Sequence, residues 1–276
     1  MSTLIIDAGS TKMEWALLEG RKVLNRFTTE GFNPNYAKPQ RLIEIVSGVE
    51  LPKAEVESVF YYGSGCLKAD NALMVGEVLR QGFPNGVPTV SNDMMGAAHA
   101  LLGKEKGIAC ILGTGANSCL YDGEAITDRA VSLGYLVGDE GSGCYIGRKL
   151  VRAYFYNLMP LELKLSFEEA YQLDINDFID NVYHKPEASR YLAGFVKFAG
   201  EHIEHPFIQE LVKGCFRDFI QAFVLRYKEC HELRVCFVGS VAFYFQNQHH
   251  ECLSAEGLTM GKVIRSPMDG LIQRYS

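Results

Sequence analysis

The chain has 276 residues, of which 47% are hydrophobic and 22% charged, and its formal net charge is −6 at pH 7. This composition is that of an ordinary globular protein, and at about 150 residues per domain the length indicates roughly two domains. The acidic balance argues against nucleic-acid binding, which needs an excess of Lys and Arg. No apolar run reaches the length of about 18 residues that a membrane-spanning helix needs. The first residues, 1–7, lack the basic segment of a secretory signal, so we expect a cytoplasmic protein.

The eight cysteines show no C-x-x-C spacing, and most of them lie in apolar segments such as 108–112 and 234–238. Zinc and iron–sulfur sites need closely spaced ligands, which this pattern does not offer. We therefore predict buried free thiols in a reducing compartment.

The opening pattern of the chain returns in its second half. The apolar segment 3–6 enters the turn Asp7–Lys12, and the apolar segment 108–112 enters the turn Gly113–Asn117. Two further apolar segments follow each turn, joined by Glu-Gly in the first half and by Asp-Gly in the second. Glycine permits the tight turns that join antiparallel strands. Each half is therefore predicted to begin with a strand, a glycine turn, a strand, a hairpin turn and a strand.

Helical and strand-like segments alternate between these two openings. The predicted order is helix 42–46, strand 56–62, helix 72–79, strand 87–90 and a helix from Asn92 or Asp93 to Gly103. This alternation predicts a mixed sheet with helices on both faces. In the second half, residues 141–229 are expected to be mostly helical, followed by strands at 234–238 and 263–264 and a helix that Ser266 caps.

The two glycine turns are candidate phosphate-binding loops. Backbone N–H groups, hydroxyls and an ammonium group can bind an anion together, and Asp7 stands where a hydrated Mg²⁺ could bridge it to phosphates. A tight hairpin alone explains either turn, but two of them, one opening each half, favour a paired phosphate site. The turns lead into strands, so neither is a Walker A loop or a Rossmann fingerprint. The candidate residues are Gly9, Ser10, Thr11 and Lys12 in the first turn, and Gly113, Thr114 and Gly115 in the second.

Three further positions carry candidate chemistry. Gly239 and Ser240 follow a predicted strand, where a nucleobase or ribose could approach the backbone, although a structural turn fits equally well. Asp93 begins a helix, where Asp is commonly an N-cap but could also accept a proton from a substrate hydroxyl. Asp139 lies in a glycine-rich segment that suits the binding of vicinal sugar hydroxyls.

Taken in order, these segments resemble the N-acetylglucosamine kinases. These enzymes form part of the BadF/BadG/BcrA/BcrD ATPase-like group within the sugar kinase/Hsp70/actin superfamily. The resemblance implies an α/β fold of two RNase H-like (actin-like ATPase) lobes, each a mixed sheet flanked by helices, with a cleft between them. The lobes would comprise residues 1–104 and 105–276, and we leave open that the last helix packs back on the first lobe. The segments that carry the resemblance are Asp7–Lys12, Asn92-Asp93, Leu112–Asn117, Gly138–Ser142 and Phe237–Ala242.

The resemblance also implies roles for single residues. The two turns would bind the phosphates of ATP with Mg²⁺, Gly239 and Ser240 would lie in the adenosine motif, and Asp93 would be the catalytic base. Sugar contacts are implied at Asn117 and Asp139. The segment 31–35 resembles the family's remaining sugar contact, with either Asn33 or Asn35 in that role, and a simple turn fits it as well.

The chain departs from the family pattern at two places on the expected sugar side. Ser132-Leu133-Gly134 stands where the family often has Gly-Trp-Gly, and Ala116 stands where Ser is common. An aromatic sugar contact is therefore missing.

Three functions are compatible with these residues. The leading hypothesis is ATP-dependent phosphorylation of an amino sugar, N-acetylglucosamine to its 6-phosphate, with a small-molecule substrate and no nucleic-acid or membrane partner; a homodimer is left open. The second is an ATPase that drives a partner reductase through an iron–sulfur cluster, for which Cys66 lies in the most suitable loop. The third is a sugar or nucleotide sensor without turnover. Metal sites at His202 and His205, or at His249 and His250 in a predicted polar loop, are disfavoured.

Overall fold

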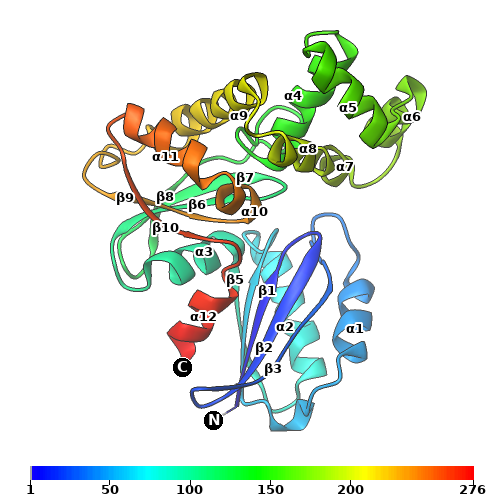
Figure 1. Ribbon diagram of the computed structural model, residues 1–276. Helices are drawn as coiled ribbons and strands as arrows, with labels where there is room; N and C mark the ends of the chain where they lie inside the picture. The colour runs from blue at the N-terminus through cyan, green and yellow to red at the C-terminus, as the bar shows by residue number, and fades with distance from the viewer. Residues whose placement is uncertain (1) are drawn as a thin grey trace. The chain divides into compact units, whose positions relative to one another are not determined.

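The computed structural model describes residues 2–276, which divide into two compact units (Figure 1). Unit 1 contains residues 2–105 and 266–276, together with the short segment 123–125. Unit 2 contains residues 106–122 and 126–265. The last eleven residues of the chain, 266–276, thus belong to unit 1 together with the N-terminal residues.

Unit 1 is built on a mixed five-stranded sheet in the order β3-β2-β1-β4-β5. β1 pairs antiparallel with β2 and parallel with β4, while β2 pairs antiparallel with β3 and β4 parallel with β5. Residues 13–18 of β2 are all buried, as expected of a strand that is covered on both faces. The strands are β1 (Ser2–Ala8), β2 (Lys12–Glu19), β3 (Lys22–Glu30), β4 (Ser58–Gly63) and β5 (Val87–Asn92).

Helices cover both faces of this sheet. On one face, α1 and α2 bury Leu42, Ile45 and Val75 against alternate residues of β1, including Leu4 and Ile6. On the other face, the C-terminal helix α12 packs against α3, as Figure 1 shows. The helices are α1 (Pro39–Gly48), the 3₁₀ turn η1 (Lys53–Glu55), α2 (Ala69–Gly82), α3 (Asp93–Leu102) and α12 (Met268–Tyr275).

Unit 2 repeats the same sheet. Its order is β10-β9-β6-β7-β8, in which β6 pairs antiparallel with β7 and parallel with β9. The pairs β7–β8 and β9–β10 are antiparallel and parallel respectively, so β6 to β8 correspond to β1 to β3. The predicted repeated opening and the predicted two-lobed actin-like fold are therefore confirmed. The strands are β6 (Gly107–Leu112), β7 (Ala116–Tyr121), β8 (Ile126–Arg129), β9 (Arg234–Val238) and β10 (Thr259–Ile264).

The long segment between β8 and β9 is helical, as predicted. It packs the aromatic core of unit 2, which includes Phe167, Phe198, Phe216 and Phe219. The first helices are α4 (Gly143–Phe155), α5 (Leu161–Tyr171), α6 (Ile175–Ile179), the π-helical η2 (Asp180–His184), α7 (Ala188–Gly194) and α8 (Val196–Glu201). The later ones are α9 (Pro206–Phe219), the π-helical η3 (Ile220–Val224), α10 (Ser240–Tyr244) and α11 (Gln246–Ala255).

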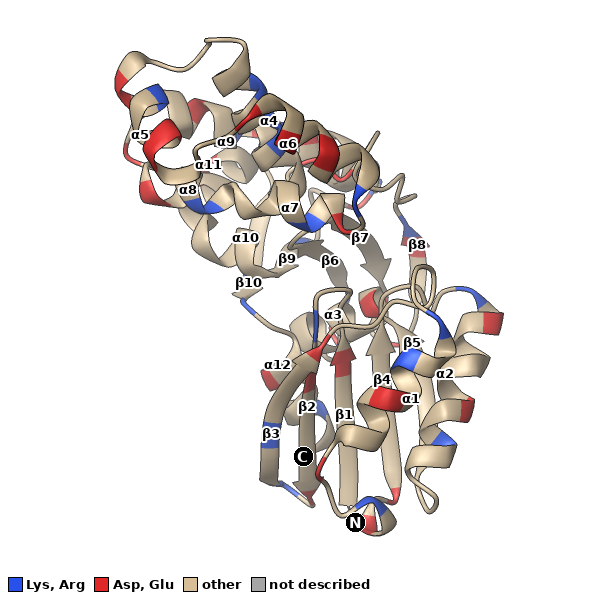
Figure 2. Ribbon diagram, turned by 90° about the vertical axis from the view of Figure 1, so that its right-hand side faces the viewer, with Lys and Arg blue, Asp and Glu red and all other residues tan. Residues whose placement is uncertain are grey.

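The structure bears on the predictions about the cysteines, the distribution of charge and membrane-spanning helices. All eight cysteines are free and buried, as predicted. Acidic and basic residues are interspersed over both units (Figure 2). Among residues 2–276, no helix combines the length and the hydrophobicity that crossing a bilayer requires.

The prediction of a polar loop around His249 is wrong. His249 lies in α11, is fully buried, and stacks on Phe216 with ring centroids 3.6 Å apart. Neither of its ring nitrogens finds a hydrogen-bond partner among the described residues. Burial lowers the pKa of His249 from 6.5 to about 3. Helical spacing places His249, Cys252 and Leu253 on the buried side of a segment whose composition is otherwise polar.

We expect His249→Phe to stabilise the protein, because the change removes two unsatisfied buried nitrogens while keeping an aromatic ring. The expected gain in the free energy of unfolding at pH 7 is about 1–3 kcal/mol. The folded protein holds His249 neutral down to about pH 3, whereas the unfolded chain protonates it near pH 6.5. The wild type should therefore lose up to about 1.4 kcal/mol per pH unit through this residue as the pH falls through that window.

Denaturant unfolding of both proteins between pH 4 and pH 7 measures these effects. The exposed neighbour His250 provides a matched control, and His250→Phe should reproduce neither effect. If the free energies of unfolding of His249→Phe and the wild type depended equally on pH, His249 would not be the buried, neutral histidine described above.

Candidate functional site

The parallel strands of unit 1 end level with one another. In the sheet register Ala8 lies opposite Gly63, and Gly63 lies opposite Asn92. The residues that follow these strand ends, Gly9, Ser64 and Asp93, therefore meet at one edge of the sheet. Such an edge is where open α/β sheets bind their ligands.

Asp93 is a half-buried carboxylate with fixed neighbours. Ser64 Oγ donates a hydrogen bond of 2.8 Å to its Oδ2, and the Met94 N–H donates one of 2.9 Å to its Oδ1. Burial raises the pKa of Asp93, and these hydrogen bonds act in the opposite direction. The N-cap of α3 is Asn92, whose Oδ1 accepts from the Met95 N–H at 2.9 Å. Asn92 thus supplies the side-chain cap of α3, and helix capping does not explain why an aspartate stands at position 93.

Three acidic side chains, those of Asp7, Glu14 and Asp93, lie near one another beside the first turn. Asp7 lies directly opposite Glu14 in the β1–β2 pair. The pKa of Asp7 is raised from 3.8 to about 7, first by burial and then by the charges of Glu14 and Asp93, while Lys12 lowers it. Residues 2–276 contain no group of three His, Cys, Asp or Glu side chains that could hold a metal. Magnesium commonly uses one or two carboxylates and takes its other ligands from phosphates and water.

The first turn leaves backbone donors unused. Gly9 N–H donates to Lys12 O at 3.0 Å, which closes the turn between β1 and β2. Across the described chain, the N–H groups of Ser10 and Thr11 donate to no protein acceptor, and both residues are exposed. Gly31 packs so closely that a Cβ there would lie 2.4 Å from the Ser10 backbone. Gly31 therefore packs against one side of the turn, while the N–H groups of Ser10 and Thr11 remain available to a ligand.

A chain of amide side chains joins this turn to two neighbouring loops. Asn33 Nδ2 donates to Ser10 Oγ at 2.9 Å, and Asn33 Oδ1 accepts from the Asn35 N–H at 3.0 Å. Asn71, in the first turn of α2, donates to Asn35 Oδ1 at 3.1 Å and to the Gly65 carbonyl at 2.9 Å. The structure thus brings Asn33 and Asn35 together with the first turn.

The second turn has the same character. Gly113 N–H donates to Gly115 O at 3.0 Å, and Gly143 N–H, at the start of α4, donates to Gly113 O at 2.8 Å. Within the described residues, the N–H groups of Thr114 and Gly115 donate to no protein acceptor. A Cβ on Gly113 would meet no atom within 4 Å, so the space in front of it is open.

Asp139 lies against this second turn. Its residue is 8% exposed, and its Oδ1 accepts a long hydrogen bond of 3.4 Å from the Ala116 N–H. A Cβ on Gly115 would lie 3.1 Å from Asp139 Oδ2. Burial raises the pKa of Asp139 against the opposing effect of the Ala116 hydrogen bond. Asp139 therefore belongs to unit 2, whereas Asn33 and Asn35 belong to unit 1.

The remaining predicted residues also lie near the second turn. Gly239 has φ +128°, and a Cβ there would lie 2.1 Å from the Leu112 carbonyl oxygen, so the position requires glycine. Ser240 is exposed and begins α10. Asn117 Oδ1 accepts from the Ser118 N–H at 2.8 Å.

Sequence reasoning missed Ser64, Glu14 and Asn71. Ser64 lies two residues after the predicted strand 56–62, and Asp93 lies three residues after the predicted strand 87–90, so the rule that parallel strands end at one edge could have found Ser64. Glu14 and Asn71 carry no such signal, because a strand residue and a residue in the first turn of a helix reach the site only through tertiary packing.

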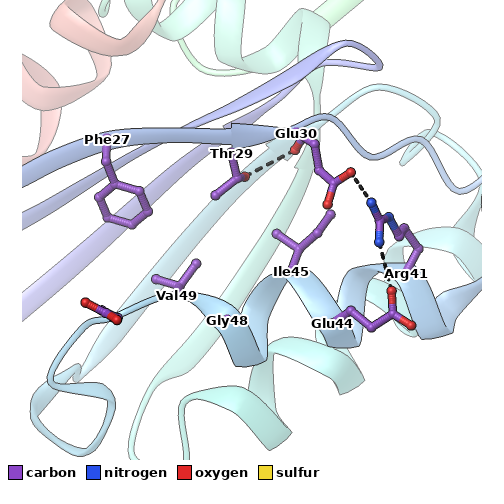
Figure 3. A pocket seen from close by; sticks show the side chains of 9 residues that line it. Phe27, Thr29, Glu30, Arg41, Glu44, Ile45, Gly48 and Val49 are labelled. Atoms are coloured by element: carbon purple, nitrogen blue, oxygen red, sulfur yellow. Dashed lines mark hydrogen bonds and ion pairs between the residues drawn. The ribbon is translucent and has the colours of Figure 1, made fainter.

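A hollow of about 360 Å³ lies between β3 and α1 (Figure 3). Phe27, Ile45 and Val49 line it, and Arg41 lies between Glu30 and Glu44. None of the predicted site residues lines this hollow. Arg41 is paired there with both Glu30 and Glu44, and we assign the hollow no function.

No family model and no curated protein matches the chain, but solved structures do. A candidate N-acetylglucosamine kinase from Porphyromonas gingivalis is 40% identical, with 99% of this chain and 98% of that chain covered and a TM-score of 0.94. A candidate N-acetylglucosamine kinase from Chromobacterium violaceum is 17% identical over 100% and 99% of the two chains, with a TM-score of 0.76. A ROK hexokinase from Thermus thermophilus is 14% identical over 100% and 97%, with a TM-score of 0.51.

The last two similarities concern the fold alone. The first extends over almost the full length of both chains at an identity that establishes common ancestry. This chain therefore belongs to the N-acetylglucosamine kinase-like family of actin-like sugar kinases.

Proposed function

We propose that this sugar kinase transfers a phosphoryl group from ATP to an amino sugar, with N-acetylglucosamine and its 6-hydroxyl as the preferred acceptor. The observation that carries the proposal is Asp93, a half-buried carboxylate at a strand end, held by Ser64 and not needed as a helix cap. Similarity to the Porphyromonas gingivalis protein supports the choice of sugar.

The residues of both turns fit ATP and magnesium. The unused N–H groups of Ser10, Thr11, Thr114 and Gly115 suit phosphate oxygens, and the exposed Lys12 adds a positive charge. Asp7 fits a hydrated Mg²⁺, since a cation would stabilise the ionised form of a carboxyl group whose pKa is raised by burial and by the charges of Glu14 and Asp93. When bound, magnesium neutralises negative charge on the transferred phosphoryl group. Gly239 and Ser240 are proposed to border the adenosine.

Asp93 acts as the general base in this proposal. Its Oδ2 accepts the proton of the sugar hydroxyl while that oxygen bonds to the γ-phosphorus and the bond from the γ-phosphorus to the bridging oxygen breaks, which releases ADP. The raised pKa of Asp93 makes the carboxylate more basic, and the hydrogen bond from Ser64 keeps its ionised form accessible. Asn33 or Asn35, together with Asn117 and Asp139, would orient the ring.

We expect Asp93→Asn to lower kcat by about 10²–10⁴-fold, because the amide cannot accept the proton. The KM for ATP should change little, since Asp93 is not among the proposed phosphate contacts. Steady-state kinetics with each substrate varied measures both values. Asp174→Asn is a matched control, because Asp174 is an exposed acid that caps α6. Turnover of Asp93→Asn near that of the wild type would contradict the assignment of the base.

We expect Ser64→Ala to shift the acidic limb of the kcat/KM profile to higher pH. The Ser64 hydrogen bond lowers the pKa of Asp93, so its removal raises that pKa and delays ionisation of the base. At high pH, where the carboxylate is ionised in both proteins, the two rates should converge. An acidic limb at the same pH in both proteins would show that Asp93 is not the titrating base.

The acceptor is tested by a coupled assay of ADP release with glucose, glucosamine, N-acetylglucosamine, N-acetylmuramic acid and N-acetylmannosamine. We expect the highest kcat/KM with N-acetylglucosamine. Release of ADP that does not depend on sugar would favour an ATPase that drives a partner, and absence of release with every sugar would favour a sensor. The burial of Cys66, which is 6% exposed, gives the partner ATPase no surface ligand in that loop.

A further inference from the structure

The orientation of the Asn71 amide is fixed by a backbone group, as is that of Asn33, whose Oδ1 accepts from the Asn35 N–H. A carbonyl oxygen can only accept a hydrogen bond, so the Asn71 atom 2.9 Å from the Gly65 carbonyl must be the NH₂ group. The same nitrogen lies 3.1 Å from an amide atom of Asn35, which must therefore be the Asn35 oxygen. The orientation of one amide thus determines that of the next.

The orientation of the Asn35 amide decides which of its groups a ligand can use. With its Oδ1 held by Asn71, its NH₂ group remains as a donor, and within residues 2–276 that group donates to no protein acceptor. The side chain is exposed. Asn33 differs, because its amide oxygen accepts from the Asn35 N–H and one of its two N–H donors binds Ser10 Oγ. Of the two candidate asparagines, Asn35 is therefore the more exposed one, and its whole NH₂ group is available to a ligand, whereas Asn33 already uses one of its two N–H donors.

The loop that carries Gly65 also carries Ser64, the partner of Asp93. Gly65 has φ +81°, and a Cβ there would lie 2.5 Å from Asn33 Oδ1 and 2.9 Å from Asn35 Nδ2. The two loops therefore pack too closely for any other residue. Asn71 joins the loop of the proposed base to the loop of the proposed sugar contact.

We propose that Asn71 is a positioning residue that holds Asn35 as a hydrogen-bond donor, so that this side of the site selects a sugar group able to accept a hydrogen bond. The inference rests on the proposed function. An acetamido carbonyl or a hydroxyl oxygen meets the requirement, whereas the ammonium group of glucosamine does not.

A double-mutant cycle tests the proposal with the wild type, Asn71→Ala, Asn35→Ala and the double variant. We expect Asn71→Ala to raise the KM for the sugar by about 3- to 10-fold, the effect of one neutral hydrogen bond. The KM for ATP should stay unchanged. The double variant should be no worse than Asn35→Ala, because Asn71 acts through Asn35.

Asn71→Asp separates hydrogen bonding from shape. The carboxylate has nearly the same shape but cannot donate to the Gly65 carbonyl, so we expect a sugar KM at least as high as that of Asn71→Ala. Asn85→Ala is the matched control: Asn85 Nδ2 also donates to a backbone carbonyl, that of Ala54, at 2.9 Å, and lies outside the site. Its loss should leave the sugar KM unchanged.

Each outcome bears on the proposal. An unchanged sugar KM in Asn71→Ala or Asn71→Asp overturns it, and so do effects of Asn71→Ala and Asn35→Ala that simply add. A merely structural role would lower the melting temperature and raise the KM for both substrates. Turnover by the wild type is measured first: its absence with every sugar overturns the proposed function as well, whereas wild-type turnover with unaltered Asn71 variants overturns this inference alone.

Discussion

The parallel pairing of β1, β4 and β5 is the constraint on which the site of unit 1 depends. Its register sets Ala8, Gly63 and Asn92 level, so the turn after β1, the loop after β4 and the first residue of α3 start from one edge. A slip by one residue would turn every side chain to the opposite face of the sheet. The apolar residues of β1 and β4 share one core with α1 and α2, and Val90 of β5 packs against it. This packing favours the register that places Asp93 at the same edge as the first turn.

Unit 2 uses the same topology for different residues. β9 takes the place of β4, and its end lies against the end of β6 so closely that Gly239 has no room for a side chain. At the corresponding edge of unit 1, Ser64 follows β4 and holds Asp93. The same strand arrangement thus places a glycine without a side chain, Gly239, after β9 in unit 2, and a hydrogen-bonded carboxylate, Asp93 with Ser64, at the corresponding edge of unit 1. The two units share the glycine turn and differ in what surrounds it.

The sequence contains enough local information to predict the fold and most of the turns. The repeated strand–turn–strand opening depends on residues that are neighbours in the chain, and the structure confirms it. The orientation of Asn35 depends on Asn71, which is 36 residues away, and no local pattern encodes it. His249 shows a second limit, because the polar composition of α11 hides the single face that is buried. Contacts between distant segments, rather than local propensities, decide these positions.

Burial of Glu14 beside Asp7 is the least expected feature of unit 1, because like charges opposite each other in a sheet are unfavourable. Arg26 compensates for it, donating from Nη2 and Nε to Glu14 Oε1 at 2.6 and 2.8 Å. Ser266 donates to the other carboxylate oxygen at 2.7 Å.

Arg26 also contacts Asp269 at the start of α12, so the segment where the chain returns to unit 1 takes part in this charge balance. After burial, Glu14 is the next largest cause of the raised pKa of Asp7, and the hydrogen-bond partners of Glu14 include Ser266 and Arg26, which is itself paired with Asp269 of the C-terminal helix. Residues at the far end of the chain thus take part in the charge network beside the first turn.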